Sequence, residues 1–526
     1  MTETLVHLLE SRAAHASSAP ALLDRGRPVS FAQLADESRR VARGLAGLGV
    51  RRGDAVAIWL PSLPAWLATF FACARLGAIA VSVNTRFRSH ELADILLRSR
   101  ARVLVFWPAF KGIDFAGILG ACDSASMQAL EAVVTYDEEP EEEAERAVLG
   151  KRTVAYRKLT ILEPLVKNEA EPGAGCAMFT TSGTTRAPKF VLHDQRTIVH
   201  HAADVVRGFG LGPDAVMYLA PPLCGVYGFC AAMAALHAGR PLVMAPAWDP
   251  EAAVRDIRTH RVTHANGTDD AFAQLVAHPE ADFSSVQFFG YAAFNPADTG
   301  FLQRAEARGL RIAGLYGSSE IQALFARQDE RLPAAARGIA GGRPVSDTAR
   351  VRVRDTVTGA LLGHDAPGEL EFHAPRSRMV EYRDNPEATR EAVDAEGWFR
   401  SGDLGTTSPD GRFTFLSRIG DALRLGGFLV SPAEIEDVVQ GAPGIAACQV
   451  VAVPGKSGLV PVAFVLLQSG AALDERAVIA HVAARLARYK VPVRVAALEA
   501  FPVTPGANAT KIQKAKLREM AGALLH

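Results

Sequence analysis

Short apolar runs alternate with longer helical patterns between Asp54 and Phe106, and this alternation limits the fold more than any other feature of the sequence. Strands are expected at Ala55–Leu60, Ala78–Val83 and Arg102–Phe106, with helices through Trp66–Arg75 and from His90. Strands joined by helices in this way form parallel βαβ units. The first part of the chain is therefore predicted to contain a parallel sheet.

The rest of the chain divides into further regions. A second α/β stretch runs from about His193 to Glu320, a strand-rich segment covers Ala349–Phe415, and a basic helix is predicted over Lys511–Arg518. A chain of 526 residues far exceeds one domain of roughly 100–150 residues. We expect an α/β protein. Its large N-terminal domain (1–418) would hold α/β subdomains with parallel sheets and a β-rich subdomain, followed by a small mobile α+β domain (419–526).

Charge and cysteine content argue against several classes of partner. Lys plus Arg (57) equals Asp plus Glu (57), so no net field attracts nucleic acid or an anionic membrane. The six cysteines contain no CxxC pair, unlike a disulfide scaffold or a zinc site. We expect a cytoplasmic protein that does not bind nucleic acid. The sequence neither requires nor excludes a homodimer.

The first hundred residues contain neither a predicted signal peptide nor a predicted membrane-spanning helix. The N-terminal ten residues lack a basic region before an apolar core, and so predict a short amphipathic helix rather than a signal peptide. The most apolar stretch, Trp66–Val83, is interrupted by Arg75 and Gly77, whereas a spanning helix needs about 20 apolar residues. It predicts a buried helix that runs into a strand.

Three polar groups are assigned no chemistry. The acidic run Asp137–Glu145, with seven acids, is typical of a solvated surface loop. Adjacent histidines on a helix point to different faces, so structural roles are favoured over a metal site for His193, His200 and His201. The basic side chains after Lys511 indicate solvated surface, or at most contacts with phosphate groups.

The sharpest local signal is the hydroxyl-rich loop Phe179-Thr-Thr-Ser-Gly-Thr-Thr-Arg-Ala-Pro-Lys189. Backbone N–H groups and hydroxyls can cradle a polyphosphate, and a lysine adds a point charge. The loop is not a P-loop, because it has one glycine and Phe190 follows the lysine. Such loops are usually plain connections, so the signal depends on what accompanies it.

Four further motifs follow this loop in order. They are Tyr316-Gly-Ser-Ser-Glu320, Ser401-Gly-Asp-Leu-Gly405, Arg418 with Gly426-Gly427 and Pro432-Ala-Glu-Ile-Glu436, and Thr510-Lys-Ile-Gln-Lys-Ala-Lys-Leu-Arg518. As a set they resemble the adenylate-forming (AMP-binding) superfamily, in its acyl-CoA synthetase branch, over essentially the whole chain. Each motif alone is weak, whereas the ordered set is specific.

The resemblance implies an ATP site and its residues. The β- and γ-phosphates and the pyrophosphate would bind Thr181, Ser182, Gly183, Thr184, Thr185 and Lys189. The adenine would be lined by backbone atoms of Gly290, Tyr291 and Ala292 and stacked on Tyr316, with Gly317, Ser318 and Ser319 leading toward the α-phosphate. Asp403 would accept from both ribose hydroxyls, Arg418 would add a second contact, and Glu320 would help to hold Mg²⁺.

Two further roles concern the small domain. Lys511 is expected to be the catalytic residue of adenylation, because attack of a carboxylate on the α-phosphate brings two anions together. Gly426 and Gly427 would line a channel for the coenzyme A thiol after the small domain has rotated.

The sequence departs from the family pattern at several positions. Arg186, Ala187 and Phe190 stand where the loop often has glycine, and the hinge residue is Gly420 instead of Asp or Lys. The approach to Lys511, Pro505–Thr510, is longer than usual. The loop geometry and the assignment of Lys511 depend on these segments.

The predicted function is ATP-dependent activation of a carboxylic acid as acyl-AMP, with release of pyrophosphate and transfer of the acyl group to coenzyme A. Two alternatives stay open. One is a stand-alone adenylating enzyme that loads a carrier-protein thiol, and the other is a nucleotide-binding protein with impaired catalysis.

The segment expected to form the acyl pocket, and so to select the acid, is Pro221-Pro-Leu-Cys-Gly-Val-Tyr-Gly-Phe229. Relatives carry Phe and His where this chain has Cys224 and Gly225. Losing two large side chains would open volume for a short or medium-chain, branched, cyclic or aromatic acid. Apolar walls would come from Val226, Tyr227, Phe229 and the pair Phe288-Phe289. Equally, neighbouring side chains could refill the space.

Overall fold

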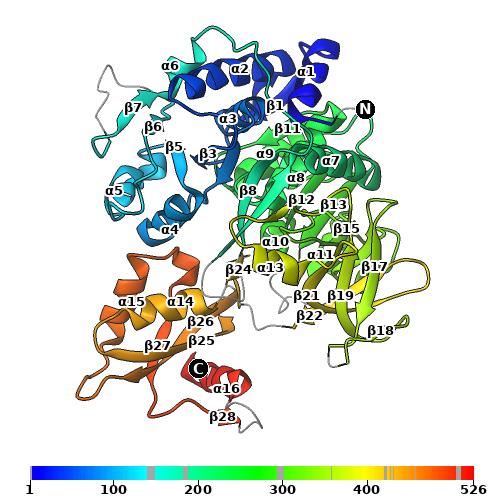
Figure 1. The fold of residues 1–526 in the computed structure, drawn as a ribbon. Helices are drawn as coiled ribbons and strands as arrows, with labels where there is room; N and C mark the ends of the chain where they lie inside the picture. The colour runs from blue at the N-terminus through cyan, green and yellow to red at the C-terminus, as the bar shows by residue number, and fades with distance from the viewer. Residues whose placement is uncertain are drawn as a thin grey trace.

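The computed structural model describes residues 3–138, 148–181, 188–292, 301–356, 358–419, 423–426, 428–430, 432–455, 458–504 and 511–525. Its chain forms two large sheets with helices around them and a separate small unit at the C-terminal end (Figure 1). The predicted fold class, a large α/β domain with a β-rich part and a small α+β domain, is confirmed.

The first sheet has eight strands in the order β20-β9-β8-β4-β3-β5-β6-β7. Its strands are β3 (Ala55–Trp59), β4 (Ile79–Ser82), β5 (Ala101–Phe106), β6 (Ala132–Thr135), β7 (Arg152–Ala155), β8 (Gly175–Thr181), β9 (Lys189–Asp194) and β20 (Glu381–Tyr382). β3 pairs in parallel with both β4 and β5, which confirms the predicted βαβ units. β9 and β20 are antiparallel additions at one edge.

The predicted buried helix before β4 is α3 (Pro64–Leu76). Proline occupies its first turn, and Gly77 ends it in the left-handed region with φ 65°, where glycine is favoured. All residues after Pro64 are buried, so the helix is apolar on every side. Arg75 is tolerated within it because its guanidinium binds Glu10 and the carbonyls of Val166 and Lys167.

The second sheet has fourteen strands in the order β18-β17-β19-β21-β22-β16-β15-β14-β13-β12-β10-β11-β1-β2. Its parallel half comprises β1 (Pro20–Asp24), β10 (Met217–Leu219), β11 (Leu242–Met244), β12 (His264–Thr268), β13 (Phe288–Ala292) and β14 (Ile312–Tyr316), with the antiparallel edge strand β2 (Arg27–Ser30). Its antiparallel half comprises β15 (Ala326–Arg327), β16 (Gly341–Pro344), β17 (Arg350–Arg354), β18 (Leu361–Leu362), β19 (Gly368–His373), β21 (Trp398–Thr407) and β22 (Phe413–Arg418).

Helices cover and join these sheets. They are α1 (Leu5–His15), α2 (Phe31–Gly47), α4 (Ser89–Ser99), η1 (Phe110–Gly112), α5 (Phe115–Gly120), α6 (Tyr156–Thr160), α7 (Gln195–Phe209), α8 (Val226–Ala238), α9 (Pro250–Thr259), α10 (Asp269–Ala277), α11 (Phe301–Ala307), α12 (Ala334–Arg337) and α13 (Pro386–Ala392). The amphipathic helix expected at the N-terminus is α1, whose buried side chains are Leu5, Val6, Leu8 and Leu9. Phe229 of α8 packs against Trp66 and Phe70 of α3 and Phe179 of β8, so one core cluster joins the two sheets.

The small C-terminal unit has its own cores. It contains β23 (Leu423–Leu425), β24 (Phe428–Val430), α14 (Pro432–Gln440), β25 (Ile445–Gly455), β26 (Gly458–Leu467), α15 (Glu475–Ala483), η2 (Arg488–Lys490), β27 (Arg494–Ala497), β28 (Val503–Thr504), β29 (Lys511–Ile512) and α16 (Lys514–Leu525). Two clusters of buried side chains draw only on these elements and the segments between them. We refer to this unit as the small domain and to the rest as the large domain.

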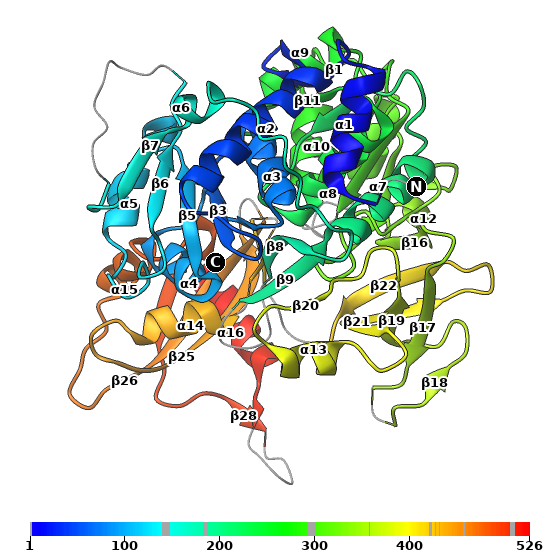
Figure 2. The same cartoon turned by 45° about the horizontal axis from the view of Figure 1, so that its top comes forward.

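The basic helix predicted over Lys511–Arg518 is wrong at its start. Helix α16 begins at Lys514, and Lys511 lies in the short strand β29, opposite Thr504 of β28. Figures 1 and 2 both draw β28 at the outer end of the small domain, whereas α14 and α4 face each other across the boundary with the large domain.

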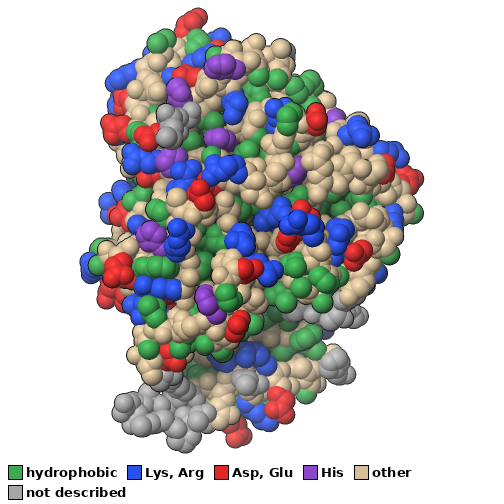
Figure 3. Space-filling view, turned by 90° about the vertical axis from the view of Figure 1, so that its right-hand side faces the viewer, with side chains coloured by type: hydrophobic (Ala, Val, Ile, Leu, Met, Phe, Trp, Pro, Cys, Tyr) green, Lys and Arg blue, Asp and Glu red, His purple; other side chains and the backbone are tan. Residues whose placement is uncertain are grey.

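On the face shown in Figure 3, Lys and Arg side chains are interspersed with Asp and Glu, so no large patch of one charge forms there. The molecule is hollowed on this face where the large domain meets the small one. Within the described ranges, no helix is both long enough and apolar enough to cross a membrane.

Candidate functional site

Several predicted site residues lie at the ends of neighbouring strands. In the fourteen-stranded sheet the adjacent parallel strands β13 and β14 end at Ala292 and Tyr316. In the eight-stranded sheet β8 ends at Thr181, which is paired with Lys189 at the start of β9. Ligands of α/β proteins bind beyond the carboxyl ends of parallel strands. These ends are therefore the candidate binding edge.

The two sheets are tied together at this edge by the segment that follows β14. The ring of His193 in β9 lies 2.7 Å through Nε2 from the carbonyl oxygen of Ser319. A carbonyl only accepts hydrogen bonds, so Nε2 carries the proton. The backbone N–H of Met379 donates to the carbonyl of Glu320 at 2.6 Å. Ser319 is thus held by His193 of the other sheet, and Glu320 by Met379 in the segment that leads into β20.

The carboxylate of Glu320 has a specific partner, the hydroxyl of Tyr382, which donates to Oε1 at 2.9 Å. Tyr382 belongs to β20, which pairs with β9. The Nζ of Lys189 lies 4.5 Å from the centroid of the Tyr382 ring, within range of a cation–π contact. Lys189, predicted to bind phosphate, and Glu320, predicted to bind metal, therefore meet at the side chain of Tyr382.

The predicted phosphate loop is framed by its two ends. Residues 182–187, which include Ser182, Gly183, Thr184, Thr185 and Arg186, lie outside the described residues. At the exit, Arg98 of α4 donates to the carbonyl of Pro188 at 2.5 Å, and its guanidinium lies 4.4 Å from the ring centroid of Phe190. Phe190 is buried. Its side chain, unusual for the family, is thus part of the packing that anchors the loop.

The predicted ribose and adenine residues contact each other. The hydroxyl of Tyr316 donates to Oδ2 of Asp403 at 2.6 Å, and both side chains are buried. The Tyr316 ring packs edge-on against Phe413, with centroids 5.0 Å apart, and at a tilt against Phe372. Stacking of Tyr316 on a base stays a prediction. The backbone of Arg418 is opposite Asp403 in β22, and its side chain is not among the described atoms.

The residues Gly290 and Tyr291 at the end of β13 were predicted to line the adenine with backbone atoms. A Cβ on Gly290 would lie 2.8 Å from the side-chain methyls of Leu315, so a larger residue there would force Leu315 to move. The hydroxyl of Tyr291 donates to the carbonyl of Gly338 at 2.6 Å, and its ring packs on Phe301. The Tyr291 side chain is therefore engaged within the core, as expected if only backbone atoms line a ligand.

The predicted acyl pocket lies at the start of α8. Gly225 precedes the helix, and a Cβ there would meet nothing closer than the Pro222 carbonyl at 3.6 Å, an ordinary contact. Gly228 differs, because its Cβ would lie 2.3 Å from the Pro221 carbonyl. The hydroxyl of Tyr227 donates to the carbonyl of Gly267 at 2.9 Å, which ties α8 to β12. Space for a side chain thus exists at position 225 and not at 228.

The aromatic walls proposed for this pocket need correction. Phe288 and Phe289 are neighbours in β13 and point to opposite faces of the sheet. Phe288 packs against Phe209, while Phe289 packs against Phe272 and Phe283 in another cluster. The pair therefore forms no single wall. Phe229 is only 1% exposed within the core between the sheets.

The thiol of Cys224 is half-buried beside the segment that follows β4. Burial raises its pKa to about 11, opposed by a hydrogen bond from the backbone of Thr85 and by the charge of Arg86. The thiol therefore stays protonated near neutral pH, and Cys224 acts as a small apolar residue.

Two of the three histidines considered, His193 and His201, are buried and contact backbone carbonyls, as expected for structural roles. Burial lowers the pKa of His193 and of His201 to about 4, so both rings are neutral near pH 7. His201 lies 2.7 Å through Nε2 from the carbonyl of Ala323. In the part of the chain that the structure describes, no group of three His, Cys, Asp or Glu side chains could hold a metal ion.

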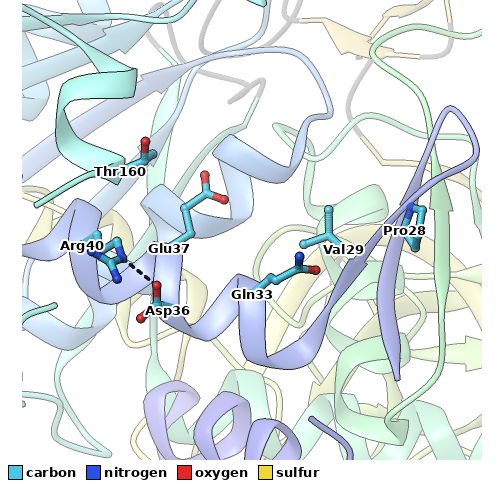
Figure 4. A pocket seen from close by; sticks show the side chains of 7 residues that line it. All are labelled: Pro28, Val29, Gln33, Asp36, Glu37, Arg40 and Thr160. Atoms are coloured by element: carbon cyan, nitrogen blue, oxygen red, sulfur yellow. Dashed lines mark hydrogen bonds and ion pairs between the residues drawn. The ribbon is translucent and has the colours of Figure 1, made fainter. Parts of the chain in front are cut away.

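A hollow of about 310 Å³ elsewhere on the surface offers no alternative site. It lies over α2, β2 and α6 and is lined by Pro28, Val29, Gln33, Asp36, Glu37, Arg40 and Thr160 (Figure 4). Its charged side chains already have partners, since Arg40 binds Asp36 at 2.6 Å and Glu37 accepts a hydrogen bond from Tyr156 at 2.7 Å. None of the predicted site residues lines it.

Comparison with known proteins identifies the family. The profile of the family described as AMP-binding enzyme matches residues 9–382, and that of the AMP-binding enzyme C-terminal domain matches residues 434–507. The chain belongs to the AMP-binding enzyme family. Its curated relatives place it in the acyl-CoA synthetase branch of the adenylate-forming superfamily, as an AMP-forming acid–thiol ligase.

Two of these relatives match along nearly their whole length. A 3-(7a-methyl-1,5-dioxo-octahydro-1H-inden-4-yl)propanoyl:CoA ligase of Mycobacterium tuberculosis is 31% identical, covering 95% of each chain. A feruloyl-CoA synthase of an Amycolatopsis species is 29% identical, covering 97% of this chain and 98% of its own.

The fold matches that of a solved enzyme in two states. A double mutant of o-succinylbenzoate CoA synthetase (MenE) of Bacillus subtilis, bound with its product analogue, has a TM-score of 0.82 at 23% identity, over 98% of both chains. The same enzyme in complex with AMP has a TM-score of 0.67 at 23% identity, over 97% of this chain and 98% of its own.

Sequence reasoning missed Tyr382 and Arg98. Each lies far along the chain from the residue that it holds, and neither belongs to a recognisable motif of phosphate chemistry. Nothing in the local sequence around Tyr382 indicated that its hydroxyl reaches Glu320.

Proposed function

We propose that this chain is an ATP-dependent acyl-CoA synthetase for a hydrophobic carboxylic acid. It would form acyl-AMP with release of pyrophosphate and then transfer the acyl group to the thiol of coenzyme A. The observation that carries the proposal is the meeting of Lys189 and Glu320 around Tyr382, at the edge where β8, β13 and β14 end.

The ATP site proposed here combines both sheets. Residues 181–189 would bind the triphosphate, the backbone of 290–292 and the ring of Tyr316 the adenine, and Asp403 with Arg418 the ribose. Residues 317–319 would run past the α-phosphate. Asp403 is well placed for this because Tyr316 and the hydroxyl of Ser401, 3.0 Å from the Asp403 N–H, fix its orientation.

The residues present fit a magnesium ion that is held largely by the substrate. Glu320 offers one carboxylate, of which Oε1 accepts from Tyr382. Mg²⁺ commonly uses only one or two protein carboxylates, with waters and substrate phosphates completing its shell. When bound, the ion neutralises part of the negative charge of the phosphates.

The two half-reactions are proposed to use different positions of the small domain, with the boundary at residues 418 and 419. In this structure Lys511 is in a hairpin at the outer end of the small domain, while Gly426 packs against Tyr489. The higher similarity to MenE with its product analogue than to MenE with AMP supports an arrangement suited to thioester formation. Gly427 and Gly420 would be its channel and hinge glycines, outside the described residues.

The proposal is tested by pyrophosphate release against a broad panel of acids, with coenzyme A thiol followed in parallel. We expect acid-dependent pyrophosphate release and an equal loss of free thiol. Pyrophosphate release without loss of thiol would favour a carrier-protein acceptor. Nucleotide binding with no acid-dependent turnover would favour a protein with impaired catalysis.

The acid itself is proposed to be branched, cyclic or aromatic and of modest size. The open space at Gly225 supports this, and the names of two relatives refer to a bicyclic propanoyl group and to a feruloyl group. Each well-buried methylene would add about 0.8 kcal/mol of binding.

Gly225→His is expected to depress kcat/KM of bulky acids by about 5–100-fold, because overfilling a packed site costs about 1–3 kcal/mol. Short linear acids should change by less than threefold. The measurement is the ratio of kcat/KM between the two acid classes in both proteins. Equal slowing of all acids, or long linear acids as the best substrates of the wild type, would refute the pocket assignment.

Tyr382→Phe is expected to weaken the binding of Mg²⁺ without removing adenylation. The change deletes one hydrogen bond to a carboxylate, worth about 1.5–3 kcal/mol, while the ring under Lys189 remains. The Mg²⁺ concentration for half-maximal pyrophosphate release should rise about tenfold or more. Tyr136→Phe, in an aromatic cluster of the large domain, is the control. An unchanged Mg²⁺ profile would show that Tyr382 only supports β20.

A further inference from the structure

A lysine of the small domain is buried between two carboxylates, one from each domain. The Nζ of Lys490 lies 2.7 Å from Oε1 of Glu91 and 2.6 Å from Oε1 of Glu434. Lys490 is 5% exposed and Glu91 6%. Such burial of charged groups is unfavourable unless each finds a partner of opposite sign.

The three groups come from opposite sides of the domain boundary. Glu91 is in the first turn of α4, which belongs to the large domain. Glu434 is in the first turn of α14 and Lys490 ends η2, both in the small domain. Figures 1 and 2 both show α4 facing α14. The ion cluster is therefore a contact between domains and not part of one core.

On the large-domain side of the contact, Glu91 also has a partner within its own domain. Oε2 of Glu91 accepts from the backbone N–H of Arg88 at 2.9 Å, which gives a partner to a backbone donor at the start of α4. The ring of Phe87 lies with its centroid 5.0 Å from Nζ of Lys490. One oxygen of Glu91 thus remains directed at the small domain, beside an aromatic face that suits a cation.

The contact adjoins the proposed thiol route. Tyr489 precedes Lys490, and its Cβ would lie 2.9 Å from a Cβ on Gly426, whose φ is 56°. On the large-domain side, the segment that leads into α4 includes Thr85, which bonds to Cys224 of the acyl pocket. The segment from 84 to 91 therefore runs from the acyl pocket to the ion cluster.

We propose that Glu91, Lys490 and Glu434 form an interdomain latch that holds the small domain in the arrangement used for thioester formation. The three side chains are positioning residues, since they hold a domain and touch no reacting atom. The latch must open before Lys511, now at the outer end of the small domain, can reach the ATP site. This inference rests on the proposed function for its catalytic consequence but not for the contact itself.

Two substitutions test the latch from its two sides. Glu91→Gln retains an oxygen for the Arg88 N–H and removes one charge, so the helix start is preserved. Lys490→Met leaves two carboxylates facing each other without a cation, and should have the larger effect. We expect thioester formation from supplied acyl-AMP to fall at least tenfold in Lys490→Met and at least threefold in Glu91→Gln. Pyrophosphate release on acyl-AMP formation should stay within twofold or rise.

Hydrogen exchange measured by mass spectrometry gives a readout that needs no substrate. Both variants should increase exchange in peptides that cover residues 85–99 and 485–495. The matched control is Lys514→Met, because Lys514 binds Glu436 of the same helix α14 at 2.8 Å, entirely within the small domain. It should increase exchange in α16 and leave residues 85–99 unchanged.

The outcomes separate the latch from the proposed function. Unchanged exchange at residues 85–99 in Glu91→Gln and Lys490→Met would overturn the latch, as would an equal loss of both half-reactions. Increased exchange in both variants, in a protein with no acid-dependent pyrophosphate release, would support the latch and reject the synthetase proposal.

Discussion

Lys511→Ala is expected to slow acyl-AMP formation by about 10²–10³-fold, while thioester formation from supplied acyl-AMP stays within threefold. A positioned cation that stabilises developing charge in the transition state contributes roughly 3–4 kcal/mol. The attacking carboxylate and the α-phosphate are both anionic, so the first half-reaction needs this cation. The second does not, because its nucleophile attacks a carbonyl carbon of an acyl-AMP that has already formed.

The two half-reactions should be measured separately, by pyrophosphate release and by thioester formation from acyl-AMP. Lys516→Ala is the matched control, because this lysine is exposed in α16 and pairs with the nearby Glu519. Pyrophosphate release within threefold of wild type in Lys511→Ala would remove Lys511 from the site. Equal losses in both half-reactions would indicate a structural role for the hairpin β28–β29.

Asp403→Ala is expected to weaken ATP binding by about 10–150-fold, which corresponds to about 1.5–3 kcal/mol for hydrogen bonds to a charged group. Removal of the carboxylate also deprives the buried hydroxyl of Tyr316 of an acceptor. A modest loss of stability should therefore accompany the loss of affinity. Titration calorimetry with ATP, together with the melting temperature, distinguishes the two effects.

Two variants separate the roles of this pair. Tyr316→Phe retains the Asp403 carboxylate and should keep most of the affinity, while Asp403→Asn keeps an acceptor for Tyr316 but removes the charge. We expect Asp403→Asn to bind ATP weakly and to melt near the wild type. Normal affinity in Asp403→Ala would make this residue a structural partner of Tyr316 only.

The order of strands and helices could be predicted because burial leaves a periodic trace in the sequence. The continuous apolar run of α3 and the short strands around it are of this kind, since strands buried on both faces and helices buried on every side carry few polar residues.

Two predictions are wrong because a strand was overlooked or its alternation of side chains was ignored. The basic residues from Lys511 onward were assigned to one helix, but a two-residue strand has no periodic trace and β29 went unseen. Phe288 and Phe289 were treated as one wall, although adjacent residues of a strand necessarily point to opposite faces. The second error could have been avoided from the sequence.

Contacts between distant segments could not be predicted. Lys490 and Glu91 are 399 residues apart, and each is an ordinary charged residue in its local sequence. The same is true of Tyr382 and Glu320, which are brought together only because β20 joins the other sheet. Gly290 was interpreted as a nucleotide-binding glycine, whereas the nearby Leu315 side chain gives it a packing reason as well.

Helix α4 makes two of the contacts described above. Glu91 at its start meets Lys490 of the small domain, and Arg98 near its end holds the carbonyl of Pro188 at the exit of the predicted phosphate loop. If a displacement of this short helix at one contact alters the other, binding at the loop and docking of the small domain are thermodynamically linked. Whatever free energy phosphate adds to or removes from docking must reappear, with the same magnitude, as a difference in phosphate affinity between the docked and undocked protein.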